Sequence, residues 1–128
     1  MKFVLKREKH QAPSGFLAEL VSSKYADEPF KIHSYLVKIN KGYTRANHYH
    51  KKKKEWITSI GGKTLLKLKH VKTGQRKQYL LDFEAKDQKI IFMPPFWSHS
   101  IAAIGGASAV LVFTLRPEDK EDTISHEV

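Results

Sequence analysis

Residues 42–50 read Gly42-Tyr43-Thr44-Arg45-Ala46-Asn47-His48-Tyr49-His50, and four lysines, Glu55 and Gly62 follow them. Side chains alternate along a strand, so His48 and His50 project from the same face, where two imidazoles can bind one metal ion. If residues 51–54 form a hairpin loop, Glu55 opens the neighbouring strand close to His50 and adds an oxygen ligand. The stretch therefore predicts a strand, a loop and a strand around a metal site.

A fourth donor has to come from elsewhere in the chain. His99 follows the Pro94-Pro95 corner at the start of another expected strand, and it is the best candidate. Three neutral imidazoles and one carboxylate suit Zn, Mn, Fe, Ni or Cu, so the ligand set predicts a divalent transition metal without naming the element.

The rest of the chain has the pattern of an all-β protein. Short β-branched or aromatic runs alternate with Gly, Pro and Lys/Asn punctuation, and no segment shows an apolar period of 3.6 residues. Residues 72–75 and the pair Gly105-Gly106 are typical of turns that join antiparallel strands. In residues 63–71, lysines alternate with Thr64, Leu66 and Leu68, which predicts lysines outside and apolar side chains inside. Strands are expected at residues 2–5, 16–21, 33–40, 45–50, 55–60, 64–71, 77–83, 89–93, 99–104 and 107–115, with 109–113 central.

Composition narrows the function classes. The chain has 128 residues and no cysteine, which suits a single domain over residues 1–128 and excludes a disulfide framework, thiolate ligands and cysteine nucleophiles. The formal net charge of +10 is uneven, because residues 116–128 form an acidic tail. The rest of the chain, residues 1–115, is therefore strongly basic. This charge favours an anionic partner, or it reflects only a lysine-rich surface.

The location and the macromolecular partners follow from what the sequence lacks. It has no run of about 20 apolar residues and no apolar core of a signal peptide near its beginning, so we expect a soluble, cytoplasmic protein with no membrane partner. The lysine run 51–54 is read as a solvated loop, because it lacks the interleaved aromatic residues of single-strand binding, and nucleic acid is not an expected partner.

The spacing around the two histidines resembles the first motif of the cupin superfamily: Gly, five residues, His-x-His, three or four residues, Glu, six residues, Gly. Every fixed position is matched, and the second cupin motif is matched at Pro94 and His99. That motif has Gly, Gly and Asn where this chain has other residues. The resemblance implies a cupin jelly-roll barrel, with a different turn before His99. The matches are at Gly42, His48, His50, Glu55 and Gly62, and the departures are Gln88, Phe96 and Ala103.

A narrower resemblance rests on residues 45–50, 94–95, 99–101 and 116–123. These segments are similar to cupin domains of polysaccharide biosynthesis, including the C-terminal domain of capsular-sugar epimerase/reductases and the sugar-nucleotide 3,4-ketoisomerases. The resemblance implies a small anionic substrate, with a nucleotide-linked 4-keto sugar as one option, and proton abstraction next to its ketone. It also implies a homodimer, in which residues 3–5 are a candidate pairing strand. A non-catalytic metal- or sugar-binding module and a metal-dependent dioxygenase are the alternatives, because one fold hosts many chemistries.

Several residues are candidates for catalysis or substrate binding. In metal-free relatives of this larger group the first histidine acts as a base, so His48 is either a ligand or a base. Tyr35 and Tyr43 are candidate proton donors, because Tyr49 should point away from the histidines. Arg45 is a candidate clamp for a substrate phosphate, and Trp56 is either a substrate contact or part of the core or pocket wall.

Overall fold

The computed structural model describes residues 9–21, 32–115 and 120–128, and the side chains of residues 19–21 are not described. The strand expected at residues 2–5 lies outside these ranges. The described part is nearly all strand, which confirms the expected all-β class. Its elements are β1 (Lys9–Ala12), β2 (Gly15–Val21), β3 (His33–Ile39), β4 (Thr44–Tyr49), β5 (Glu55–His70), β6 (Arg76–Asp82), β7 (Ile90–Met93), β8 (Trp97–Thr114), the 3-10 turn η2 (Lys120–Asp122) and β9 (Ile124–Ser125).

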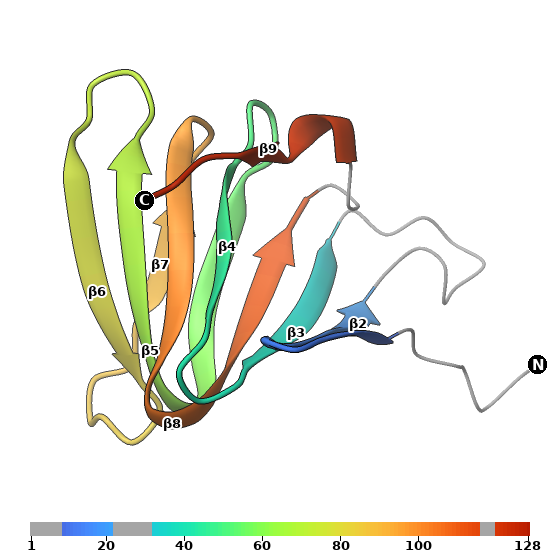
Figure 1. Ribbon diagram of the computed structural model, residues 1–128, viewed down its shortest axis with the longest axis vertical. Coiled ribbons are helices and arrows are strands. Elements are labelled where there is room, and N and C mark those ends of the chain that lie inside the picture. Colours follow the sequence, from blue (N-terminus) through green and yellow to red (C-terminus); the bar gives the residue numbers. More distant parts are fainter. Residues whose placement is uncertain (1–8, 22–31, 116–119) are drawn as a thin grey trace, which may run out of the picture.

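Two long strands, β5 and β8, run antiparallel to each other and carry the sheet from one layer into the next (Figure 1). The second half of β8 pairs with β3 on one side and the first half of β5 on the other. The first half of β8 pairs with β4 and the second half of β5. The remaining strands extend these two layers. β2 pairs with β3, and β1 pairs with β2; β9 pairs with β4; β6 and β7 both pair with β5. The result is a curled antiparallel sheet of jelly-roll type.

The bend between the layers corrects one expectation from the sequence. Gly105-Gly106 is not a turn between two strands but lies inside β8. It falls between Ile104, which pairs with Lys63, and Ala109, which pairs with Gly61, where the pairing register shifts. Glycine in the interior of a strand often marks a tight bend, since it has no Cβ to obstruct the approach of the neighbouring backbone. The break expected between residues 60 and 64 is the same bend, and β5 is continuous through it. The loop at residues 72–75, by contrast, does join β5 to β6 as expected.

Gly62 is needed at this bend for two reasons. Its φ is 66°, and a Cβ built there would lie 2.6 Å from the backbone oxygen of Ala107. Gly62→Ala should therefore lower the free energy of unfolding by about 2–4 kcal/mol, by strain at positive φ and by overpacking. Gly74→Ala is the matched control, because Gly74 has φ 74° but no atom within 4 Å of the added Cβ. Urea unfolding of both variants tests this, and equal losses would show that the close contact at Ala107 is unimportant.

The core lies between the two layers. The expected alternation in β5 is confirmed: Thr64, Leu66 and Leu68 are buried, while Lys63 and Lys67 are exposed. Residues 109–113 are also central, since this part of β8 lies between β3 and β5. Several core side chains also line the cavity of the candidate site described below, so the same packing stabilises the core and the cavity wall. The buried apolar cluster contains Val37, Ile39, Ile57, Leu66, Leu68, Leu81, Met93, Ile101, Val110 and Val112.

Candidate metal centre

The end of β4 is reshaped by an irregularity just before the two histidines. Ala46 and Asn47 have φ of 74° and 57°, and the pairing with β8 shifts register between Ala46 and His48. Asparagine tolerates this left-handed conformation, whereas alanine does so at a cost of about 1–2 kcal/mol. Such bulges bend a strand and re-aim its side chains. Beyond the bulge, His48 lies directly opposite His99 of β8.

The four residues expected to bind a metal are brought together. One ligand atom from each of His48, His50, Glu55 and His99 lies within 4.8 Å of the others. The Oε1 atom of Glu55 is 3.0 Å from Nε2 of His50 and 3.6 Å from Nε2 of His99. Glu55 is the first residue of β5, as expected, but the expected hairpin is wrong. β4 pairs with β8 and β9 and not with β5, so residues 51–54 carry the chain from one layer to the other.

The unsatisfied atoms of this cluster fit a metal ion. Nε2 of His50 and Oε1 of Glu55 are buried, and neither has a hydrogen-bond partner among the described residues. Buried polar atoms are nearly always partnered, so two of them facing each other need an explanation. Donors that bind one metal at about 2.1 Å and at right angles lie about 3 Å apart. The 3.0 Å separation observed here is compatible with a shared ion, and it is also that of a direct ion pair between His50 and Glu55.

The electrostatics favour a neutral imidazole at His48 and at His99 but not at His50. Burial works to lower the pKa of His50, but the contact with Glu55 and its charge outweigh burial and raise the pKa. Burial, together with the neighbouring His99 and His50, lowers the pKa of His48 to about 3. Burial also lowers the pKa of His99. For Glu55, burial works to raise the pKa, but the contact with His50 and the charges of His99 and Lys53 outweigh it and hold the pKa below its ordinary range. Neutral His48 and His99 beside an ionised carboxylate are the protonation states that metal ligation requires, whereas His50 would have to release a proton from Nε2 to bind the ion.

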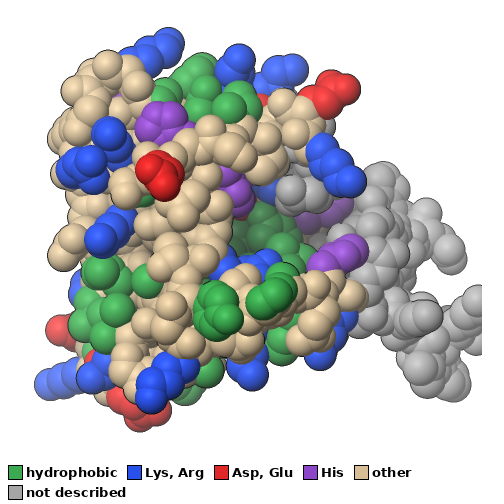
Figure 2. Space-filling view, in the orientation of Figure 1, with side chains coloured by type: hydrophobic (Ala, Val, Ile, Leu, Met, Phe, Trp, Pro, Cys, Tyr) green, Lys and Arg blue, Asp and Glu red, His purple; other side chains and the backbone are tan. Residues whose placement is uncertain are grey.

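A cavity opens in front of the cluster, visible as a hollow in Figure 2. Its volume is about 110 Å³, and half of its lining side chains are apolar. The metal-binding candidates form its polar wall. The other lining residues are Leu17, Tyr35, Val37, Arg45, Ala46, Lys53, Ile57, Met93, Ile101 and Val112.

The structure separates the remaining candidates into two groups. Tyr35 and Arg45 line the cavity: the Tyr35 hydroxyl donates to Oε2 of Glu55 at 2.5 Å, and Nη1 of Arg45 donates to Oγ of Ser14 at 2.7 Å. Tyr43 and Trp56 do not line it. Tyr43 is 45% exposed just before β4, and Trp56, next to the inward-facing Glu55, points to the other face of β5 and stacks on Phe92. Strand alternation is the physical reason for the placement of Trp56.

Lys53 is a site residue that the sequence prediction missed. Lys51, Lys52 and Lys54 are exposed, as expected for a solvated loop, but Lys53 is only 2% exposed and lines the cavity. Its Nζ donates to the Tyr35 hydroxyl at 3.0 Å and lies 3.7 Å from Oε2 of Glu55. Four identical residues in a row carry no pattern that could have marked the third one.

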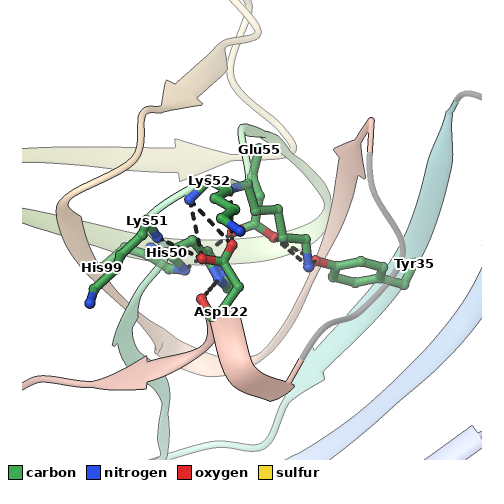
Figure 3. Close-up of polar contacts among 8 residues, drawn as sticks. Tyr35, His50, Lys51, Lys52, Glu55, His99 and Asp122 are labelled. Carbon is green, nitrogen blue, oxygen red and sulfur yellow. Dashed lines mark hydrogen bonds and ion pairs between the residues drawn. The ribbon is translucent and has the colours of Figure 1, made fainter.

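Asp122 is the second residue that was missed. The described part of the expected acidic tail, residues 120–128, packs back on the site, with β9 paired to β4. The Asp122 carboxylate accepts hydrogen bonds from the backbone N–H groups of Lys51, Lys52 and Lys53 at 2.9, 3.1 and 3.0 Å (Figure 3). Burial works to raise the pKa of Asp122, but these N–H groups outweigh it and lower the pKa.

Asp122 also contacts a candidate metal ligand through its backbone. Its carbonyl oxygen is 2.8 Å from Nδ1 of His50 (Figure 3). When Nδ1 carries the proton and donates to this oxygen, the lone pair of Nε2 faces Glu55 and the candidate metal position. The C-terminal segment thus sets the orientation and the tautomer of His50.

The turn before His99 keeps its left-handed conformation despite the missing glycine. Phe96 has φ 67°, the positive value that glycine would supply, so the expectation of a different turn here is wrong. Its N–H donates to the carbonyl of His50 at 2.8 Å, and the ammonium of Lys72 lies 4.6 Å from its ring centre. These contacts hold a strained residue in place and connect the start of β8 to the end of β4.

Comparisons with known proteins agree with this geometry. Residues 10–123 match the family described as Polysaccharide biosynthesis C-terminal domain. The capsular polysaccharide assembling protein CapF from Staphylococcus aureus superposes with a TM-score of 0.85 at 19% identity, covering 98% of this chain and 33% of that one. A structure of CapF with the inhibitor 3-isopropenyl-tropolone gives 0.84 at 19% identity, covering 98% and 35%.

A second type of similar structure is oxalate decarboxylase. The Lactobacillus farciminis enzyme, in a formate complex, superposes with a TM-score of 0.76 at 20% identity, covering 93% of this chain and 33% of that one. The chain therefore spans about a third of the length of these solved proteins. The sequence matches no curated protein. These likenesses confirm the expected cupin jelly roll. Within the described residues, no helix is long and apolar enough to cross a membrane.

Proposed function

The chain belongs to the family of polysaccharide biosynthesis C-terminal domains, and on this premise we propose that it is a metal-binding cupin that epimerises or isomerises a nucleotide-linked sugar. One observation carries the proposal: four donor atoms of the expected types converge within 4.8 Å of one another at the wall of a cavity. Pockets with a few converging polar groups in an apolar lining are typical of small-molecule sites.

The metal would be held by His48, His50, Glu55 and His99, and Zn, Mn, Fe and Ni all suit these donors. When bound, a divalent ion supplies Lewis-acid polarisation of a carbonyl oxygen. A His48 side chain with a pKa of about 3 is a weak base at neutral pH, which supports the ligand role over the base role.

Two side chains of the cavity wall are assigned to the substrate. Tyr35 presents its hydroxyl beside Glu55, where it can exchange a proton with a bound ligand, and it is our candidate proton donor. Arg45 offers a planar set of donors suited to a phosphate or carboxylate group. Tyr43 and Trp56 have no place in this cavity, so we assign them no role there.

The size of the cavity limits what enters it. A volume of about 110 Å³ is well below the roughly 300–1,000 Å³ that encloses a drug-sized ligand. Only the reacting end of a nucleotide sugar would therefore enter, with the nucleotide remaining outside. The apolar walls formed by Ile57, Met93 and Val112 keep water away from that end.

Hydrogen exchange into the substrate tests the proposal without knowledge of the product. Zinc-loaded and manganese-loaded protein would be incubated in deuterated water with nucleotide-linked 4-keto sugars, and deuterium at the carbon next to the ketone would be followed by NMR. We expect incorporation with the wild-type protein and none with His99→Ala. Ligand-induced shifts without incorporation would indicate a non-catalytic binding module, and oxygen consumption by iron-loaded protein would indicate an oxygenase.

We also propose a homodimer. β1 is the last strand on its side of the sheet among the described residues and pairs there only with β2, so its outer edge is a candidate for pairing with a second copy. Light scattering behind size exclusion should give twice the chain mass, and a monomer mass at micromolar concentration would contradict the proposal.

A further inference from the structure

The outer face of one layer of the sheet is apolar. In β5 the side chain of Ile57 lines the cavity, so its neighbours Trp56 and Thr58 point to the opposite face of the sheet. The pairing register aligns two residues from each of β7, β5, β8 and β3 on this face. Six of these eight residues have large apolar side chains, and we call them the outer patch: Leu36, Trp56, Ile90, Phe92, Leu111 and Phe113.

The outer patch is open to solvent at its β7 side. Ile90 is 67% exposed and Phe92 is 43% exposed, while the other four side chains are half-buried. The ring of Phe92 stacks on Trp56 with 5.2 Å between the ring centres. A large side chain has a surface of about 150–250 Å², so the patch offers roughly 400 Å² in all. Monomeric proteins rarely expose more contiguous apolar surface than a few hundred Å², and patches of this size mark contact sites.

No charged side chain interrupts the outer patch. The first charged residues on this face are Lys54, two positions before Trp56, and Lys38, two positions after Leu36. The chain has a net charge of +10, so two copies repel each other wherever lysines meet. An acidic partner would find no opposite charge on the patch, whereas a second copy of the chain would meet an equally uncharged surface.

The shape and size of the outer patch also suit a second copy. Sheets pack face to face with interdigitating side chains, and a two-fold contact needs a surface that is complementary to itself. A stable interface covers about 800 Å² per partner, with an apolar, aromatic centre and a polar rim. An apolar centre of roughly 400 Å² surrounded by such a rim meets this requirement.

We propose that the outer patch is the contact surface of a two-fold homodimer, with the stacked Trp56 and Phe92 as its aromatic anchor. This inference rests on the homodimer proposed above and names its surface, for which the edge of β1 is the competing candidate. The cavity lies on the other face of the same layer, so a dimer formed here does not cover the metal site.

A charge placed on the outer patch tests this surface. The dissociation constant of the dimer would be measured on the full chain by analytical ultracentrifugation. Ile90→Glu puts a carboxylate at the most exposed position of the patch and should raise the dissociation constant at least about 30-fold, the factor for loss of an interface hot spot. Leu80→Glu is the matched control, because it adds the same charge at a 44% exposed leucine of β6, outside the patch. It should leave the constant unchanged.

A second variant and a second probe keep the inference testable if Ile90→Glu folds poorly. Ile90→Thr keeps a β-branched side chain that suits a strand, and it should raise the dissociation constant about 10-fold through lost apolar burial. Trp97→Phe leaves Trp56 as the only tryptophan of the chain. Acrylamide quenching of its fluorescence should then increase when the dimer is diluted into monomers.

Each contrary result has a separate meaning. A wild-type dimer whose dissociation constant changes in neither Ile90 variant overturns the inference and leaves the homodimer standing, with β1 as its surface. An equal effect of Leu80→Glu also overturns it, since the charge would then act at any position. Trp56 that is already shielded from acrylamide in the monomer would show that a segment of the same chain covers the patch. A wild-type protein that is monomeric at micromolar concentration overturns both the homodimer and its surface, while the metal and sugar experiments remain independent of this result.

Discussion

Replacing His50 or His99 by alanine should remove the metal almost completely. Each change deletes one of four donors from a buried cluster whose atoms lie within 4.8 Å of one another. Loss of a residue that merely supports a ligand typically costs 10-fold to 100-fold in metal affinity, so loss of a ligand should cost at least about 100-fold. Elemental analysis of protein purified without a histidine tag should show near-stoichiometric metal in the wild type and almost none in either variant.

Two further variants show whether the loss is specific. His10→Ala removes an exposed histidine of β1 and should retain the metal. Glu55→Gln keeps the size of the side chain but removes the negative charge, and it should lose metal as the histidine variants do. A wild-type protein that contains no metal and takes up no added zinc, manganese or iron would refute the metal centre, and His48 would then be the leading candidate for a base.

The spacing of a few residues was enough to predict most of this site. His48 and His50 are two residues apart, so strand alternation alone predicts that they share a face. Glu55 was predicted correctly for the wrong reason: β4 and β5 do not pair, and residues 51–54 carry the chain across to the layer in which β5 begins. His99 was a less direct prediction, because Phe96 stands where the resemblance has glycine. The structure shows why His99 still reaches the cluster: Phe96 adopts φ 67° and is held there by the carbonyl of His50.

The features that the sequence did not reveal depend on contacts between distant segments. Asp122 meets His50 across 72 positions of the chain, and no local pattern records such a contact. The burial of Lys53 likewise depends on Tyr35 and Glu55, which lie on two other elements. Gly105-Gly106 was misread for a different reason: glycine pairs permit both a tight turn and a bend in a continuous strand, and only pairing with β5 distinguishes them.

Asp122→Ala should destabilise the protein and weaken metal binding together. The change removes the acceptor for three backbone N–H groups in the loop that carries Lys53. Hydrogen bonds to charged groups contribute about 1.5–3 kcal/mol, and water can replace part of this loss at the exposed Lys51 and Lys52, so we expect a decrease of about 2–3 kcal/mol in the free energy of unfolding. Urea unfolding of metal-free protein measures this term without any contribution from the ion.

The effect on the metal follows from the backbone of the same residue. Once the carboxylate no longer anchors η2, the carbonyl of Asp122 should leave Nδ1 of His50, and zinc affinity should fall about 10-fold to 100-fold. Glu121→Ala is the control, because it removes a neighbouring exposed acid. Asp122→Asn keeps one acceptor oxygen and should lie between wild type and Asp122→Ala. Zinc affinity has to be measured under conditions where Asp122→Ala is folded. If that affinity is unchanged, His50 is oriented without the C-terminal segment, and β4 alone is sufficient to build the histidine side of the centre.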